Sequence, residues 1–221
     1  MARLHTLQAI SKLATFSSCH GIAHWKAAKH VLRYIKGTPN HGLLYSRSRK
    51  TIKQEWQLTM FVDSDYATDI DTRRSRAGYL VYLNDNLISY RSTLQRGVGK
   101  DLTPSTDTCE AENKVLSLGL KELIWATMLL ETMGIQVETP TLIWEDNSAC
   151  IDITCNDSAC KRSKHIDVRH HFIREYYKAG VIDIKYISSK SQPADILTKS
   201  LGPSLFKFFR DIIVSDRCLL S

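Results

Sequence analysis

The chain of 221 residues lacks the features that mark several classes of protein. It has no apolar run approaching the ~18–20 residues that cross a bilayer. Its first ten residues hold no long apolar block and no small-residue cleavage site, which argues against a secretory signal. The six cysteines are therefore expected to be reduced thiols in the cytosol or nucleus. With 43% apolar and 24% charged residues, the composition excludes disordered and low-complexity classes.

Acidic residues are nearly missing from the first quarter of the chain. Residues 1–57 contain ten lysines and arginines but a single acid, Glu55, so this segment carries a charge of +9. Residues 58–221 carry −2, from 20 basic and 22 acidic residues, which leaves the whole chain at +7. A basic segment beside a nearly neutral body favours an acidic partner, most simply nucleic acid, over a merely solvated helix face.

The spacing of apolar residues predicts a helical segment followed by an α/β unit. The first 37 residues are predicted to be helical with a break at 17–21, and the polar residues 38–57 to be a linker. The elements expected after them are strands at 58–62, 141–145 and 181–187, a hairpin at 78–90, and helices at 110–133, at 166–178 and after Pro193. This order predicts a mixed sheet with helices packed on it.

Two of these helices are expected to bury large side chains. Trp25 and Leu32 lie on the apolar face of the second helix, and we interpret Trp25 as a core residue rather than a base-stacking platform. From the helix at 110–133, the residues available to the core are Val115, Leu116, Leu118, Leu123, Trp125 and Leu129. Both helices are therefore predicted to pack through these residues.

Four acids fall where predicted elements begin or end. Asp63 closes the first strand, Glu112 lies one turn inside the long helix, Asp146 follows the strand at 141–145, and Asp195 opens the last helix. If the two strands are neighbours, Asp63 and Asp146 end side by side, and the helices can bring the other two acids there. Clustered carboxylates persist only when protons or cations neutralise them, and paired Mg²⁺ or Mn²⁺ ions are the usual device for attack on a phosphodiester. A single strand-end aspartate more often caps a turn.

Six motifs in order carry a resemblance to a known family. They are FVDSDY at 61–66, RRSRAGY at 73–79, CEAE at 109–112, WEDNSA at 144–149, KHIDVRHHFIRE at 164–175 and ADILTK at 194–199. Together they resemble the ribonuclease H domain at the C-terminal end of copia-type retrotransposon Pol polyproteins. The upstream HWKAAKHVLRYIKGT at 24–38 is similar to the segment that links the polymerase to that domain. The resemblance covers about residues 20–205.

The resemblance implies a ribonuclease H-like α/β fold, with a mixed five-stranded sheet flanked by helices and preceded by an N-terminal helical segment. It divides the chain into a connecting segment at 1–57, a ribonuclease H-like domain at 58–200 and a C-terminal tail at 201–221. The implied activity is hydrolysis of the RNA strand of RNA–DNA hybrids with two Mg²⁺ (or Mn²⁺) ions. The implied partners are the hybrid and the reverse transcriptase portion of the same polyprotein, with no membrane. The expected location is the cytoplasm (in a virus-like particle) and/or the nucleus.

The family's four metal-binding acids fall on Asp63, Glu112, Asp146 and Asp195, the acids already reached from element ends. Glu110 is the alternative to Glu112. The resemblance also has departures: Asn113 stands where the family commonly has tyrosine, residues 95–110 are about two residues longer than the usual pattern, and the loop at 188–193 lacks the histidine that some cellular ribonucleases H carry. The chain has no Tyr-x-Asp-Asp motif and no room for polymerase fingers and palm. We therefore expect a tail fragment of a polyprotein or a truncated genomic copy.

A basic strip follows the predicted metal site along the chain. Lys161, Lys164, Arg169 and Arg174 are predicted to contact phosphates beside the active site, with a solvated helix face as the alternative. Over the same stretch, cysteines and histidines recur every five residues, at positions 150, 155, 160, 165 and 170. Structural zinc usually takes paired ligands at closer spacing, so we favour ordinary thiols over a zinc site.

Three functions remain open from the sequence. The first is a divalent-metal-dependent endoribonuclease, which the retention of all four acids favours. The second is a catalytically silent nucleic-acid-binding remnant of a decayed retrotransposon, which the truncated start and Asn113 keep open. The third is a domain that only supports a polymerase.

Overall fold

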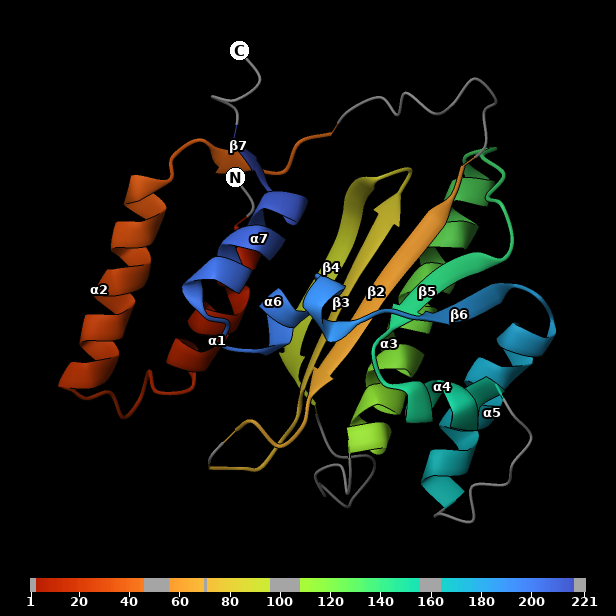
Figure 1. Cartoon of the computed structure of the whole chain (residues 1–221), viewed down its shortest axis with the longest axis horizontal. Helices are drawn as coiled ribbons and strands as arrows, with labels where there is room; N and C mark the ends of the chain where they lie inside the picture. Colours follow the sequence, from red (N-terminus) through yellow and green to blue (C-terminus); the bar gives the residue numbers. More distant parts are fainter. Residues whose placement is uncertain (1–2, 46–55, 70, 96–107, 156–163, 217–221) are drawn as a thin grey trace.

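A mixed five-stranded sheet forms the centre of the molecule (Figure 1). The computed structural model describes residues 3–45, 56–69, 71–95, 108–155 and 164–216, and the structural statements below concern these residues. The sheet order is β4-β3-β2-β5-β6. The strands are β2 (Leu58–Asp65), β3 (Arg76–Leu83), β4 (Asn86–Leu94), β5 (Thr141–Glu145) and β6 (Ile182–Tyr186). β2, β3 and β4 pair antiparallel, whereas β5 runs parallel to both β2 and β6.

Helices cover both faces of the sheet (Figure 1). One face carries α3 (Thr108–Thr132), α4 (Ser148–Cys155) and α5 (Lys164–Lys178). The other face carries the short η1 (Leu4–Thr6), α1 (Leu7–Ala14), α6 (Asp195–Thr198) and α7 (Pro203–Ile213). A helical segment therefore precedes a mixed sheet flanked by helices, as predicted, and the fold class is confirmed.

Three smaller features complete the described architecture. α2 (Ile22–Gly37) packs against α1 at the outside of the molecule, and η2 (Ser189–Ser191) lies in the loop before α6 (Figure 1). The two-residue strands β1 (His41–Gly42) and β7 (Ser215–Asp216) pair with each other. None of the helices in the described part of the chain has the length and apolar character needed to span a bilayer.

Alternation along β2 sorts its side chains between two apolar clusters. Leu58, Met60 and Val62 are fully buried in the cluster that includes α3, and each such burial stabilises the fold by ~1.5–3 kcal/mol. Phe61 packs with the cluster on the opposite face. α3 lies very close to β2 because Gly119 has no side chain; a Cβ there would come within 2.6 Å of the Met60 sulfur.

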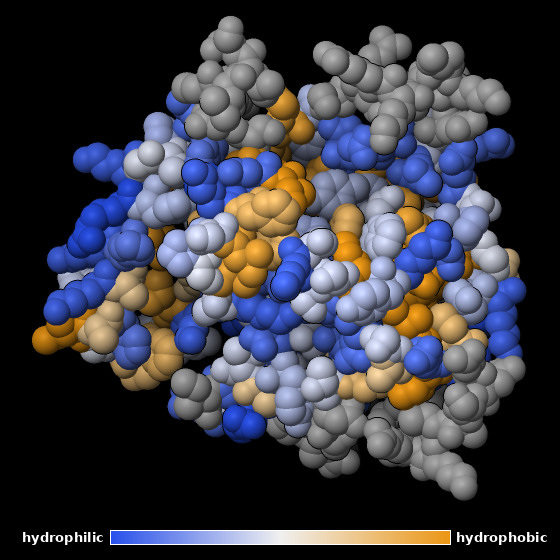
Figure 2. Space-filling view, in the orientation of Figure 1, coloured by the Kyte–Doolittle hydropathy of each residue, from blue (hydrophilic) through white to orange (hydrophobic). Residues whose placement is uncertain are grey.

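The helix α7 lies in the segment that was expected to be a tail. Phe209 and Ile213 are buried against residues from η1, β3 and α6, so the two ends of the chain pack together on one face of the sheet. The spacing of Leu205, Phe209 and Ile213 after Pro203 is a helical signal that the sequence analysis did not use. In Figure 2 an apolar patch lies over this helix, which also carries the half-exposed Phe208 and Ile212.

The prediction that two helices bury their tryptophans is wrong. Trp25 and Leu32 are 57% and 63% exposed, because α2 lies outside α1 and not on the sheet. In α3 the buried stripe runs through Leu116, Leu120, Leu123, Ala126 and Leu130. Trp125 and Leu129 fall on the other side of that helix and are 58% and 45% exposed. The core prediction is confirmed for Val115, Leu116 and Leu123 of α3, which are buried, whereas α2 buries none of its residues.

Candidate active site

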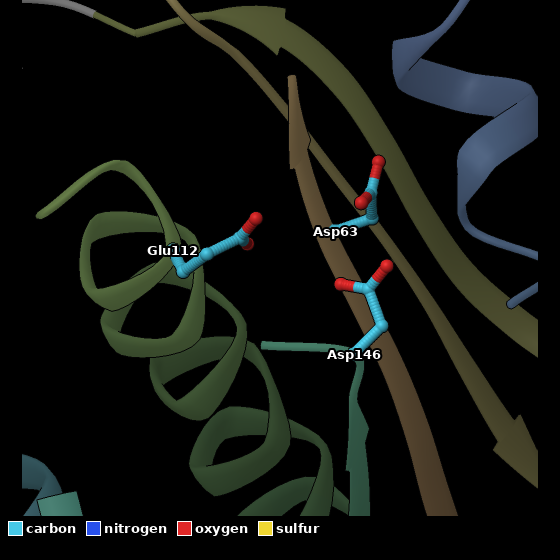
Figure 3. A group of neighbouring side chains, drawn as sticks. All are labelled: Asp63, Glu112 and Asp146. Atoms are coloured by element: carbon cyan, nitrogen blue, oxygen red, sulfur yellow. The ribbon is translucent and has the colours of Figure 1, made fainter. Parts of the chain in front are cut away.

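Three carboxylates converge at one end of the sheet (Figure 3). Asp63 lies near the end of β2 and Asp146 directly follows β5; because these strands are parallel neighbours, their carboxyl ends meet at one edge. Glu112 reaches the same point from the first turns of α3. One oxygen of each side chain lies within 4.8 Å of the others, and among the described residues no other group of three His, Cys, Asp or Glu shares this geometry. Glu110 instead pairs with Lys114 at 2.8 Å.

A glycine allows the fourth acid to approach this group. Gly78 on β3 is the partner of Asp63 across the sheet, and a Cβ at this position would lie 2.7 Å from a methyl group of Thr198 and 2.9 Å from Leu197. The missing side chain lets α6 lie directly on the sheet. The buried Gln192 holds the preceding loop in place, since its Nε2 donates to the Val62 carbonyl at 2.8 Å.

Asp195 meets Asp63 through a lysine rather than joining the group of three acids. Lys199 Nζ lies 2.9 Å from Asp63 Oδ1 and 2.8 Å from Asp195 Oδ1. The Thr198 hydroxyl donates to the other oxygen of Asp63. Lys199 belongs to the motif at 194–199, where no role was predicted for it, although its position four residues after Asp195 at a helix end was a signal for an ion pair.

Burial and mutual repulsion disfavour the charged forms of these acids. Burial, followed by the charges of Glu145 and Asp63, raises the pKa of Glu112 well above its ordinary value. Burial also raises the pKa of Asp63, against the opposing charge of Lys199. The pKa of Asp195 rises to about 7, through burial and the nearby charge of Asp63. A cation at this point would reverse these shifts.

A fifth carboxyl, missed by the sequence analysis, lies behind the site. Glu145 at the end of β5 is fully buried, and burial raises its pKa well above the ordinary value. Its Oε1 accepts a hydrogen bond from the backbone N–H of Asn147 at 3.1 Å. The second oxygens of Glu145 and Glu112 are buried without a hydrogen-bond partner among the described residues. An unpartnered, buried Glu112 oxygen beside two further carboxylates is a donor set that suits a hard divalent cation.

The comparisons with known proteins agree with the sequence motifs. No family model matches the chain. It is 34% identical over 201 residues to the retrovirus-related Pol polyprotein from transposon RE2 of Arabidopsis thaliana, an overlap of 91% of this chain and 13% of that protein. It is 32% identical over 205 residues to the corresponding polyprotein from transposon TNT 1-94 of Nicotiana tabacum, an overlap of 93% and 14%. The homologues of this chain are copia-type retrotransposon Pol polyproteins.

The chain spans only 13–14% of the length of these curated relatives. Among solved structures it aligns with LC11-RNase H1 in complex with an RNA/DNA hybrid, at a TM-score of 0.47 and 12% identity, over 64% of this chain and 94% of that one. The mixed five-stranded sheet with flanking helices is the arrangement that the resemblance in the sequence motifs implied.

The departures from the copia-type pattern have local structural explanations. Asn113 is buried, and its amide donates to His170 Nδ1 at 2.9 Å, so it ties α3 to α5. In the loop without a histidine, the Ser189 hydroxyl donates to Asp146 Oδ2 at 2.7 Å and fixes that carboxylate. Neither departure removes a carboxylate from the site. The longer stretch between 95 and 110 lies largely outside the described residues.

A basic cleft of about 370 Å³ lies beside α3. Its lining includes Arg91 of β4, Lys114 and Lys121 of α3, and Arg169 of α5. Lys114 follows Glu112 by two residues on α3, so the two side chains project from different sides of this helix. Several cations around a polar cleft suit a phosphate backbone.

The predicted basic strip is only partly placed by the structure. Arg169 lines the basic cleft, where burial lowers its pKa against the charge of Glu110. Arg174 donates to the carbonyls of Ile153 at 2.8 Å and Thr154 at 3.2 Å, and so caps the end of α4. Lys161 and the side chain of Lys164 lie outside the described part of the chain. Phosphate contact by these four residues stays a prediction.

The five-residue series of cysteines and histidines forms no metal group within the described ranges. Cys150 is buried in α4, and Cys155 is half-buried at the end of that helix. His170 bonds to Asn113 instead. Cys160 and the side chain of His165 fall outside the described residues.

Proposed function

We propose that this chain is a divalent-metal-dependent endonuclease that hydrolyses the RNA strand of RNA–DNA hybrids as part of a copia-type Pol polyprotein. One observation carries the proposal: oxygens of Asp63, Glu112 and Asp146 lie within 4.8 Å of one another at the end of the sheet. This arrangement stands in a chain whose relatives are retrotransposon Pol polyproteins.

The residues that would hold two Mg²⁺ or Mn²⁺ ions are Asp63, Glu112, Asp146 and Asp195. When bound, such ions supply a nucleophilic water at neutral pH and stabilise the leaving oxygen of a phosphodiester. The protein's own part is to hold these carboxylates. α3 presents Glu112 from the main core, Ser189 orients Asp146, and Thr198 orients Asp63. Asp63 belongs to the group of three acids and also shares Lys199 with Asp195, so it is the carboxylate that both halves of the site have in common.

The enzyme would distinguish an RNA–DNA hybrid from other duplexes by contacts with both of its strands. The 2′-hydroxyls in the minor groove mark the RNA strand and distinguish it from DNA. Phosphates of the substrate would lie in the basic cleft lined by Arg91, Lys121 and Arg169, where counterion release contributes to affinity. We extend the proposal to the reverse transcriptase portion of the polyprotein as a partner, in a cytoplasmic particle and/or the nucleus.

Cleavage of a hybrid with one labelled strand tests this function. The full chain should cut only the RNA strand, lose activity in chelator and regain it with Mg²⁺ or Mn²⁺. Asp146→Asn should abolish cleavage while circular dichroism shows a folded protein, and Asp152→Asn on α4 is the matched control that should cleave normally. Equal cleavage by Asp146→Asn and wild type, or none by wild type at any metal concentration, would favour the catalytically silent remnant.

A further inference from the structure

The acids at the end of the sheet divide into two groups that share Asp63. In the first, Asp63 faces Glu112 and Asp146, and neither Glu112 nor Asp146 forms an ion pair with a described residue. In the second, Asp63 faces Asp195, and the Lys199 ammonium lies between them at 2.9 and 2.8 Å. Within the described residues, Glu112 and Asp146 thus have no cationic partner, whereas Asp63 and Asp195 share Lys199.

Lys199 is held firmly in this position. The carboxylates of Asp63 and Asp195 are 1% and 6% exposed, whereas the lysine side chain is 30% exposed. α6 rests on the sheet through Gly78, and Thr198 beside the lysine bonds to the same Asp63 carboxylate. Paired with two nearly buried carboxylates, the ammonium is well neutralised there, yet its partial exposure gives it a path toward solvent.

We propose that Lys199 is a built-in cation that occupies the Asp63–Asp195 half of the site, so that a second divalent ion binds there only by displacing it. This inference rests on the proposed function, because it assumes that the carboxylates bind divalent ions. The first ion enters the Asp63–Glu112–Asp146 half, where Glu112 and Asp146 form no ion pair with a described residue. The second competes with a unit positive charge within hydrogen-bond distance of two of its ligands. At such distances a unit charge changes binding by a factor of ten or more.

Mn²⁺ binding to the full chain, followed by calorimetry and electron paramagnetic resonance, tests the displacement without relying on activity. Wild type should bind one ion tightly and a second at least ~10-fold more weakly. Lys199→Met removes the charge and keeps a side chain of similar length, so the second ion should bind at least ~10-fold more tightly than in wild type. The spin-coupled signal of two neighbouring ions should then appear at a lower Mn²⁺ concentration. Lys199→Arg keeps a cation and should behave like wild type.

Lys207→Met is the matched control, because it makes the same charge change at an exposed position of α7. It should leave both affinities unchanged. If Lys199→Met and wild type bind the second ion equally, the lysine proposal is wrong while the metal site stands. If no variant binds a divalent ion at all, the proposed function fails with it.

A second measurement covers the case in which Lys199→Met does not fold. In wild type with ¹⁵N-labelled lysine, the Lys199 ammonium signal should be protected by its two ion pairs. It should persist through the first equivalent of Mg²⁺ and be lost as the second binds. An ammonium signal that remains unchanged while two ions bind would overturn the proposal.

Discussion

The two faces of the sheet bring acids to the same point by different physical means. On one face, Glu112 is carried by a helix of 25 residues whose buried stripe forms much of the main core. On the other face, Asp195 is carried by a helix of four residues. Hydrogen bonds from Gln192 and Thr198 and the ion pairs of Lys199 hold this short helix in place. Glu112 is therefore positioned by apolar packing, and Asp195 by polar contacts on a surface that Gly78 leaves flat.

Packing on the α3 face should carry most of the stability. Leu120→Ala removes a fully buried side chain from the main cluster and should lower the free energy of unfolding by ~2–5 kcal/mol. Urea unfolding followed by circular dichroism measures the change. A loss below about 1 kcal/mol would mean that α3 is not held by its core stripe.

The two close glycines should respond differently to the same substitution. Gly78→Ala places a methyl group 2.7 Å from Thr198 and 2.9 Å from Leu197, which should lower the free energy of unfolding by ~1–3 kcal/mol and move α6 off the sheet. Gly119→Ala meets the flexible end of Met60, and the helix gains ~1 kcal/mol of propensity, so the net change should be smaller.

Urea unfolding of both glycine variants, together with Mn²⁺ binding, measures the contrast. Gly78→Ala should also weaken ion binding, because Asp195 moves with α6. If both variants are equally destabilised, the α6 face is not the more tightly constrained contact.

The Asp195 carboxyl should make the α6 face sensitive to pH. Its pKa is raised in the folded state from 3.8 to about 7, so the stability that its protonated form contributes is full below about pH 4 and is lost as the pH rises to about 7. His5 acts with opposite sign, since burial lowers its pKa to about 4 and its contribution is lost as the pH falls from 6.5 toward 4. The comparison that isolates the carboxyl is therefore wild type against Asp195→Asn.

Without divalent ions, wild type should lose stability relative to Asp195→Asn as the pH rises from 4 to 7. Saturating Mg²⁺ should make this difference in stability depend less on pH. Urea unfolding at several pH values gives the curve. A flat difference would show that Asp195 has an ordinary pKa in the folded protein.

The smallest effect is expected from relieving repulsion among the acids. Asp146→Asn should raise the stability of the metal-free protein by ~0.5–1 kcal/mol, because it removes one charge beside Asp63 and Glu112. The amide oxygen can still accept the Ser189 hydrogen bond. Thermal unfolding in chelator measures the shift, and Mg²⁺ should reverse the order of the two proteins. A destabilised Asp146→Asn in chelator would contradict the electrostatic explanation.

Sequence reasoning located the carboxylates because their positions depend on strand ends and topology. Asp63 and Asp146 had to meet once β2 and β5 were parallel neighbours, a pairing that the order of elements left open and the structure shows. The roles of the residues that sequence reasoning missed depend on contacts between elements that are distant in the sequence. Lys199 and Glu145 acquire their roles from burial and from contacts across the sheet, which neither periodicity nor element order reveals.

Dependence on tertiary contacts also explains why the burial of two tryptophans was predicted wrongly. Trp25 and Trp125 lie on helices that were predicted correctly, but which face is buried depends on the neighbour against which each helix packs. α2 packs outside α1, and α3 buries a stripe on the opposite side from Trp125. Hydrophobic spacing predicts a helix more reliably than it predicts the partner of that helix.

The central claim, that Asp63, Glu112 and Asp146 form a divalent-cation site, is tested most directly by anomalous diffraction at the manganese edge from crystals grown with Mn²⁺. The account predicts a peak within ligand distance of an oxygen from each of the three carboxylates, and no such peak in crystals of Glu112→Gln grown under the same conditions. An ordered site without a manganese peak at saturating Mn²⁺, or a peak bound only by other residues, would contradict it.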